Sequence, residues 1–170
     1  MTTAQLIGAL GLLAVIGLLA YCVSLYNGVQ RLINLIPEVS SNIAVLVRKR
    51  TDLISKLIAI VDSYGLHESG IDLKVAGEFG GSAGPNQTRA VIERLASLRM
   101  AFPELKADGL YDNLMQQLAQ VETDIAARRE QYNSTVRAYN TAISQFPDNL
   151  LLSRLGFQAR QFLSEQELSA

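Results

Sequence analysis

Residues 6–23 form an unbroken run of apolar residues and glycine, LIGALGLLAVIGLLAYCV, and the first charged side chain of the sequence is Arg31. At ~1.5 Å per residue, a helix of this run is about 27 Å long, close to the ~30 Å hydrocarbon core of a bilayer. A core helix of a soluble protein normally keeps a polar face, and this run has none. The run therefore predicts a transmembrane anchor over residues 1–28, with Tyr21 and Tyr26 near the membrane interface.

The residues flanking the run favour a retained anchor and predict its orientation. The segment MTTAQ has no Lys or Arg, unlike the start of a cleaved signal peptide, and bulky Tyr21 directly before Cys22 is unlike a lipoprotein cleavage site. These two alternatives and a buried core helix stay open. Basic residues follow the run at Arg31 and at 48–50. The positive-inside rule thus predicts an N-terminus outside and a cytoplasmic C-terminal domain.

After the anchor, apolar residues recur in alternating steps of four and three, the heptad spacing of packed helices. One series consists of Val39, Ile43, Leu46, Leu53, Leu57, Ile60 and Tyr64, with Arg50 as a charged member. A second consists of Leu114, Leu118, Val121, Ile125, Arg128, Tyr132, Thr135, Tyr139, Ala142 and Phe146. Each series predicts a long helix. Pro37 is expected to begin the first helix or to kink its junction with the anchor.

Shorter segments join and follow these two helices. Residues 77–87, GEFGGSAGPNQ, predict a Gly-rich loop, and residues 88–100 a short amphipathic helix. Asp108 or Asp112 is expected to cap the longest helix, which Phe146-Pro147 should close. A tail interrupted by Gly156 follows.

The predicted fold is therefore all-α: a single N-terminal transmembrane helix, followed over residues 29–170 by an elongated antiparallel bundle of three to four helices. A continuous coiled coil between chains is the alternative.

The composition argues against most kinds of reactive site. With one His and one Cys, zinc sites that need several such ligands are excluded, and common catalytic triads would all have to use His67. The Gly-rich loop lacks the Gly-Lys-Ser/Thr of a phosphate-binding loop. With 15 basic and 16 acidic residues, the chain lacks the basic excess of nucleic-acid-binding proteins. We therefore expect no catalytic residue, cofactor, metal or nucleic-acid partner.

Three sets of residues are candidates for structural or interaction roles. Arg50, Asp52, Glu122 and Arg129 lie on or beside the apolar stripes, where charges need partners, and predict an interhelical ionic network. The pairs Tyr132-Asn133 and Tyr139-Asn140 are a heptad apart, so each residue type shares one helix face. They are expected to satisfy buried polar groups, with a partner-recognition surface as the alternative. Ala20, Ser24 and Gly28 recur every fourth position, a spacing that permits close helix approach in a bilayer.

The order of these motifs resembles the LemA family. The stretch RREQYNSTVRAYNTAISQFPDNLLLSRLGF is similar to the family signature, through Arg129, Tyr132-Asn133, Tyr139-Asn140, Phe146-Pro147, Asn149-Leu150 and Gly156-Phe157. Upstream, the resemblance continues through Tyr26-Asn27, Lys49-Arg50, Asp52-Leu53-Ile54, Tyr64, His67-Glu68 and the segment 102–106. The family often has Pro at the position of Ser55 and an aromatic residue at that of Leu155.

The resemblance implies a single N-terminal span in the bacterial cytoplasmic (inner) membrane, a helical bundle and no established enzymatic activity. It also implies a role in membrane organisation or as a partner of envelope proteins, including membrane proteases. We therefore expect a non-enzymatic scaffold that contacts membrane lipid and forms a homo-oligomer larger than a dimer. An accessory protein for an envelope protease or signalling protein is the alternative.

Overall fold

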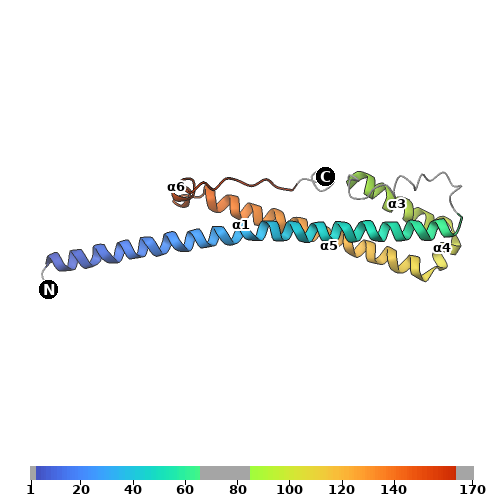
Figure 1. Ribbon diagram of the computed structural model, residues 1–170, viewed down its shortest axis with the longest axis horizontal. Coiled ribbons are helices and arrows are strands. Elements are labelled where there is room, and N and C mark those ends of the chain that lie inside the picture. Colours follow the sequence, from blue (N-terminus) through green and yellow to red (C-terminus); the bar gives the residue numbers. More distant parts are fainter. Residues whose placement is uncertain (1–2, 66–84, 164–170) are drawn as a thin grey trace. The chain divides into compact units, whose positions relative to one another are not determined.

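The computed structural model describes residues 3–65 and 85–163, and the regular secondary structure in these ranges is all α-helical. Figure 1 shows the helices in chain order: α1 (Thr3–Ser63), α3 (Pro85–Ala101), α4 (Pro103–Ala107), α5 (Gly109–Ser144) and α6 (Asp148–Leu152). The all-α class is confirmed, whereas the antiparallel bundle arrangement stays a prediction. Residues 77–84 of the expected Gly-rich loop, and His67, lie outside the described residues. Residues 85–87 begin α3 instead, because proline is well tolerated in a first helical turn.

Helix α1 is continuous through Pro37, so a new helix does not begin there; a kink at this junction, the alternative, stays a prediction. Proline removes one hydrogen bond from a helix interior. The turns on either side of Pro37 are nevertheless packed, since Ile36 and Val39 are buried. The burial of these neighbours provides contacts that can offset the missing bond.

The N-terminal part of α1 is the candidate membrane span. Its most apolar window has a mean hydropathy of 2.5, and none of that window is buried against the rest of the chain. By length and composition the helix can cross a membrane. The exposed apolar side chains from Leu6 to Val23 would be solvated by lipid there.

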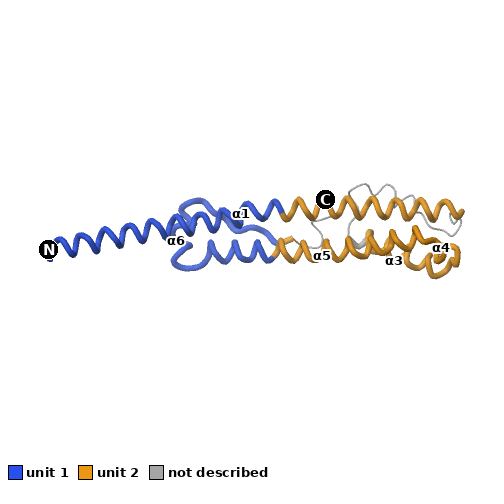
Figure 2. The backbone as a smooth tube through the Cα atoms, turned by 90° about the horizontal axis from the view of Figure 1, so that it is seen from below, with its two compact units in different colours: residues 1–38, 134–162 blue, residues 39–133, 163–170 orange. Residues whose placement is uncertain are grey.

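The chain divides into two compact units, which Figure 2 shows in different colours. Unit 1 comprises residues 1–38 and 134–162, and unit 2 comprises residues 39–133 and 163–170. Helices α1 and α5 each contribute residues to both units.

Unit 2 contains the larger apolar core, which is built from the heptad series and the short helices. Its buried members are Leu53, Ile54, Leu57, Ile58 and Val61 of α1, Leu95 and Leu98 of α3, Leu105 of α4, and Tyr111, Leu114, Leu118, Val121 and Ile125 of α5. The Tyr111 hydroxyl donates a hydrogen bond to the Leu95 carbonyl at 2.9 Å. Burial raises the pKa of Tyr111 to about 12, so the phenol stays neutral.

The start of α5 is capped by Asp108, as predicted. Its Oδ1 accepts hydrogen bonds from the backbone N–H groups of Leu110 at 2.8 Å and Tyr111 at 3.1 Å. The Tyr64 hydroxyl donates to the other carboxylate oxygen at 3.0 Å. The bond from the Tyr111 N–H, then those from Leu110 and Tyr64, lower the pKa of Asp108 and favour the charged cap.

Unit 1 has a smaller core, formed by Val29 and Ile36 of α1, Val136 and Tyr139 of α5, and Leu152 of α6. Two members expected in the second heptad series are exposed instead. Arg128 lies at the surface, where it donates a hydrogen bond to Gln131 at 2.8 Å, and Phe146 is 75% exposed. Thr135 and Tyr139 are buried, so the series continues through most of α5, with Arg128 as an exposed member, and fails at Phe146, beyond the end of that helix.

Gly156 turns the chain back along α5. Its φ of +81° lies in the left-handed region that favours glycine. The Gly156 N–H bonds to the Ser153 carbonyl and the Phe157 N–H to the Leu152 carbonyl, each at 3.3 Å, the pattern of a Schellman motif. Residues 157–163, here called the C-terminal segment, follow without regular secondary structure. Figure 1 shows this segment running back from α6.

Candidate functional site

The best-formed polar site in unit 1 is a clamp in which Asn140 of α5 holds the backbone of Arg160. The Asn140 Nδ2 donates to the Arg160 carbonyl at 2.8 Å, and its Oδ1 accepts from the Arg160 N–H at 2.9 Å. One side-chain amide thus pairs with both backbone groups of a single residue. This arrangement copies the pairing of two peptide groups in a sheet.

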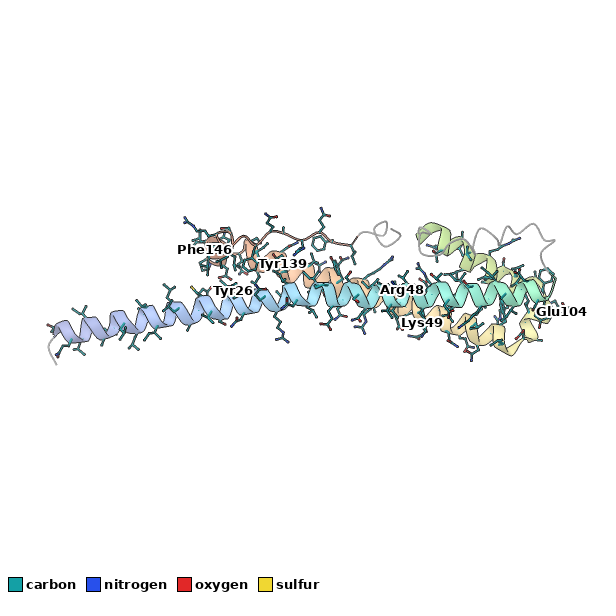
Figure 3. All side chains as sticks on the ribbon, in the orientation of Figure 1. Tyr26, Arg48, Lys49, Glu104, Tyr139 and Phe146 are labelled. Carbon is teal, nitrogen blue, oxygen red and sulfur yellow. The ribbon has the colours of Figure 1, made fainter. Side chains whose placement is uncertain are left out.

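Tyr139 adds a second contact to the same segment. Its ring is buried at 1% exposure, and its hydroxyl donates to the Gln158 carbonyl at 2.9 Å. A shallow cavity of about 280 Å³ lies beside it, lined by Ile33, Tyr139 and residues 156–160. The rings of Tyr26 and Phe157 meet edge to face with their centroids 6.1 Å apart. Figure 3 labels Tyr139 and Tyr26 on their helices.

The same chemistry occurs within unit 2 at the first Tyr-Asn pair. Asn133 donates to the Leu163 carbonyl at 3.3 Å and accepts from the Leu163 N–H at 2.9 Å. Tyr132 is half-buried. A helix advances about 10.5 Å over seven residues, and an extended chain advances about 10 Å over three. A heptad repeat of asparagine therefore suits backbone partners three residues apart.

These contacts recognise the main chain and not its side chains. Residues 158–162 of the C-terminal segment are exposed, while their backbone groups make the bonds to Tyr139 and Asn140. Both asparagines bond to backbone groups of a returning segment that lies 20 and 30 positions later in the sequence, at a part-buried site for Asn133 and an exposed one for Asn140. The heptad spacing could signal a clamp, but nothing in the sequence identified its partner.

The predicted ionic network is only partly assembled. Arg50, 8% exposed, lies with its Nη1 3.6 Å from Glu122 Oε1. Asp52 pairs instead with Lys56 on the surface at 2.7 Å. The Nε of Arg129 is buried without a hydrogen bond to the described part of the chain.

An ion pair between Arg99 and Asp112 was not predicted. Arg99 Nε lies 2.5 Å from Asp112 Oδ1, and a second guanidinium nitrogen lies 3.0 Å from Oδ2. The hydrogen bond and charge of Asp112 raise the pKa of Arg99. The sequence suggested Asp112 only as a helix cap, because no spacing rule connects it to a residue of another helix. The pair joins α3 to α5.

The small residues Ala20, Ser24 and Gly28 are all exposed on α1. A Cβ added at Gly28 would meet nothing within 4 Å in the described chain beyond the nearby helix backbone. These three residues, here called the ridge, are therefore open to another molecule.

Within residues 3–65 and 85–163, no three His, Cys, Asp or Glu residues are grouped as metal ligands would be. The clamp and the apolar helix are thus the main features from which function can be argued. An all-helical chain with an exposed apolar N-terminal helix belongs to the class of membrane-associated helical proteins.

Comparison with protein families identifies one family within this class. The model of the LemA family matches residues 80–170, and the chain belongs to that family. Both Tyr-Asn pairs, the cap Asp108 and the Gly156 turn lie inside the matched residues.

The chain is also similar to proteins described as magnetosome proteins. It is 31% identical over 90 residues to MamQ 1 and MamQ 2 of Paramagnetospirillum magneticum, a match that covers 53% of this chain and 30% of each relative. It is 29% identical over 73 residues to MamQ of Magnetospirillum gryphiswaldense, covering 43% of this chain and 27% of that relative. The aligned part therefore spans less than a third of these relatives.

Proposed function

We propose that this protein is a membrane-anchored scaffold that homo-oligomerises and organises or shapes the membrane that holds it. The span of α1 contacts membrane lipid, in the bacterial cytoplasmic membrane. The N-terminus faces outward and the C-terminal domain lies in the cytoplasm. The orientation follows from the charge asymmetry between MTTAQ and the basic residues after the span.

The observation that carries this proposal is the continuity of α1. The helix begins in the exposed apolar segment and supplies Leu53, Leu57 and Val61 to the core of unit 2 without a break. Each copy is thus confined to the membrane plane by the same helix that builds its fold. Such confinement raises the effective concentration of lateral contacts, so interfaces that are weak in solution can hold an assembly together.

The proposed domain is an antiparallel helical bundle. Two pairings within unit 2 support this arrangement, since Arg50 of α1 meets Glu122 and Tyr64 meets Asp108. As the position in α1 increases, the position of its partner decreases. This order is the one expected for neighbouring helices that run in opposite directions.

The test is the mass of the full-length protein in mild detergent, measured by light scattering. We expect an assembly larger than a dimer. Changing Ala20, Ser24 and Gly28 together to Leu should reduce its mass, because Leu prevents close helix approach. Gly8→Leu with Gly11→Leu is the matched control, since those glycines have open space and, at about 100° per residue, lie on the other side of the helix from Ala20, Ser24 and Gly28. A monodisperse full-length monomer would contradict the scaffold proposal.

A second candidate function, an adaptor for an envelope protease or signalling protein, is favoured by the clamp. Tyr139 and Asn140 bind main-chain atoms of the C-terminal segment, and a non-helical segment of another protein offers the same groups once it displaces residues 158–160. An adaptor should be extracted from membranes as a small oligomer with one partner. A large homo-oligomer without another protein would favour the scaffold.

A further inference from the structure

Exposed apolar side chains are concentrated where α5 turns into α6. Phe146 is 75% exposed, Leu150 62% and Leu155 52%. Single exposed apolar residues are normal on protein surfaces, as at Met100. Three within ten positions call for an apolar partner.

Two contacts within unit 1 fix where this turn lies along α1. The Tyr21 hydroxyl donates a hydrogen bond to Asp148 of α6. Five residues later, the Tyr26 ring meets Phe157. The chain from α6 to the C-terminal segment therefore lies beside residues 21–26 of α1. Figure 3 places Phe146 on the N-terminal side of Tyr26 along this helix.

This position coincides with the end of the apolar run. Tyr21 belongs to the last turn of residues 6–23, and the hydrocarbon core of a bilayer is flanked by polar layers of roughly 5–7 Å. When the run spans the bilayer, Tyr21 lies at the edge of the hydrocarbon core, and a turn beside it borders such a layer. Aromatic and apolar side chains with polar neighbours are favoured there.

We propose that the α5–α6 turn, residues 145–156, inserts into the interfacial layer of the leaflet through which α1 leaves the membrane. Phe146 and Leu150 contact lipid acyl chains. The Asp148 carboxylate keeps a polar partner in Tyr21, which reduces the cost of bringing a charge to this depth. Arg154 is exposed in the same turn, and a long cationic side chain at this depth can extend to lipid phosphate. The partner of this surface is a phospholipid leaflet.

This inference rests on the membrane anchoring in the proposed function, and it adds a second lipid contact to each copy. A wedge in one leaflet, beside a span through both, would expand that leaflet selectively. Each single chain could therefore bend the membrane by this insertion, whatever the size of the oligomer.

The sequence contains no tryptophan, so one introduced tryptophan reports its own surroundings. Full-length Phe146→Trp and, separately, Leu150→Trp would be reconstituted into phosphatidylcholine vesicles whose acyl chains carry bromine. The fraction that floats with the vesicles would be measured. Met100→Trp is the control, because Met100 is 88% exposed and belongs to unit 2, whereas the anchor and the turn belong to unit 1.

We expect a blue-shifted emission and strong quenching by brominated lipid for Trp at 146 and 150, and little quenching at 100. Quenching at both turn positions by aqueous iodide, and not by lipid, would overturn the proposal. Protection from both quenchers would also overturn it, since the turn would then contact protein. If the chain does not float with the vesicles, the membrane-anchored function fails as well. Floating without lipid quenching contradicts the inserted turn alone.

Discussion

The asparagine clamp illustrates what single residues contribute to this fold. An asparagine side chain has the donor and acceptor of a peptide group. Asn140 can therefore make the two hydrogen bonds to the backbone of Arg160 that a neighbouring β-strand would make. The sequence identified Asn133 and Asn140 as one helix face with a polar role. It could not identify their partners, because the C-terminal segment has no periodicity that would fix its direction.

Asn140→Asp should loosen the C-terminal segment. Aspartate still accepts from the Arg160 N–H but cannot donate to the Arg160 carbonyl, which its charge repels. Losing one or two partly exposed hydrogen bonds costs about 1–2 kcal/mol, roughly a 5–30-fold increase in local opening. The measurement is the rate of trypsin cleavage after Arg160, followed by mass spectrometry.

Asn113→Asp is the control for this measurement. Asn113 also accepts a side-chain hydrogen bond, from Gln117 at 2.5 Å, but it makes no contact described for the C-terminal segment. Its replacement should leave cleavage after Arg160 unchanged. Equal rates in the wild type and in Asn140→Asp would show that the clamp does not hold the segment.

At the scale of elements, heptad spacing predicted the buried faces of α1 and the first half of α5. Val39, Ile43, Leu53 and Leu57 are all buried, as the spacing requires. The pattern failed where helix packing gives way to other contacts. Pro37 did not begin a new helix, and the buried neighbours on either side of it can offset its missing hydrogen bond. Beyond Arg128, Thr135 and Tyr139 are still buried at the predicted spacing, but Tyr139 and Asn140 bond there to a non-helical segment and not to another helix.

The charged member of the α1 series should be replaceable by an apolar one. Arg50 is buried together with the Glu122 Oε1 that faces it, but the Glu122 side chain as a whole is 38% exposed, so its carboxylate can turn to water when its partner is lost. A buried ion pair often stabilises no more than apolar packing of similar volume. Arg50→Met should therefore keep or raise the melting temperature. The free energy of unfolding of Arg50→Ala should be about 2 kcal/mol lower than that of Arg50→Met, because alanine leaves a cavity.

Thermal unfolding followed by circular dichroism would measure both variants of Arg50. Arg89→Ala provides the baseline, since its pair with Glu93 has side chains 81% and 66% exposed and should contribute little. If Arg50→Met and Arg50→Ala lowered the melting temperature equally, the ion pair and not packing would dominate at this position.

At the scale of the whole molecule, sequence reasoning separated the chain at residue 28 into an anchor and a folded domain. The compact units divide differently: residues 1–38 belong with 134–162. Hydropathy detects the environment of a segment but not its long-range contacts. The contacts of Tyr21 with Asp148 and of Tyr26 with Phe157 are separated by more than a hundred positions, and no local pattern encodes them.

A variant that begins at residue 29 should keep the core of unit 2 and loosen unit 1. It lacks Tyr21 and Tyr26, but none of the core residues between Leu53 and Ile125. We expect faster amide hydrogen exchange at residues 157–162 than in the full-length protein, and unchanged exchange around Leu118. The full-length double variant Tyr21→Phe with Tyr26→Ala should reproduce the faster exchange. Unchanged protection of residues 157–162 in both variants would refute this assignment.

Recognition through backbone atoms has an evolutionary consequence for the C-terminal segment. Since Asn133 and Asn140 bind peptide groups, the identities of the exposed side chains from Gln158 to Phe162 contribute little to holding the segment. Substitutions there can accumulate nearly neutrally. Proline is the exception at 160 and 163, because it has no N–H to donate. Related proteins could thus differ in the exposed side chains of residues 158–162, and in the molecules that these side chains contact, while keeping both asparagines.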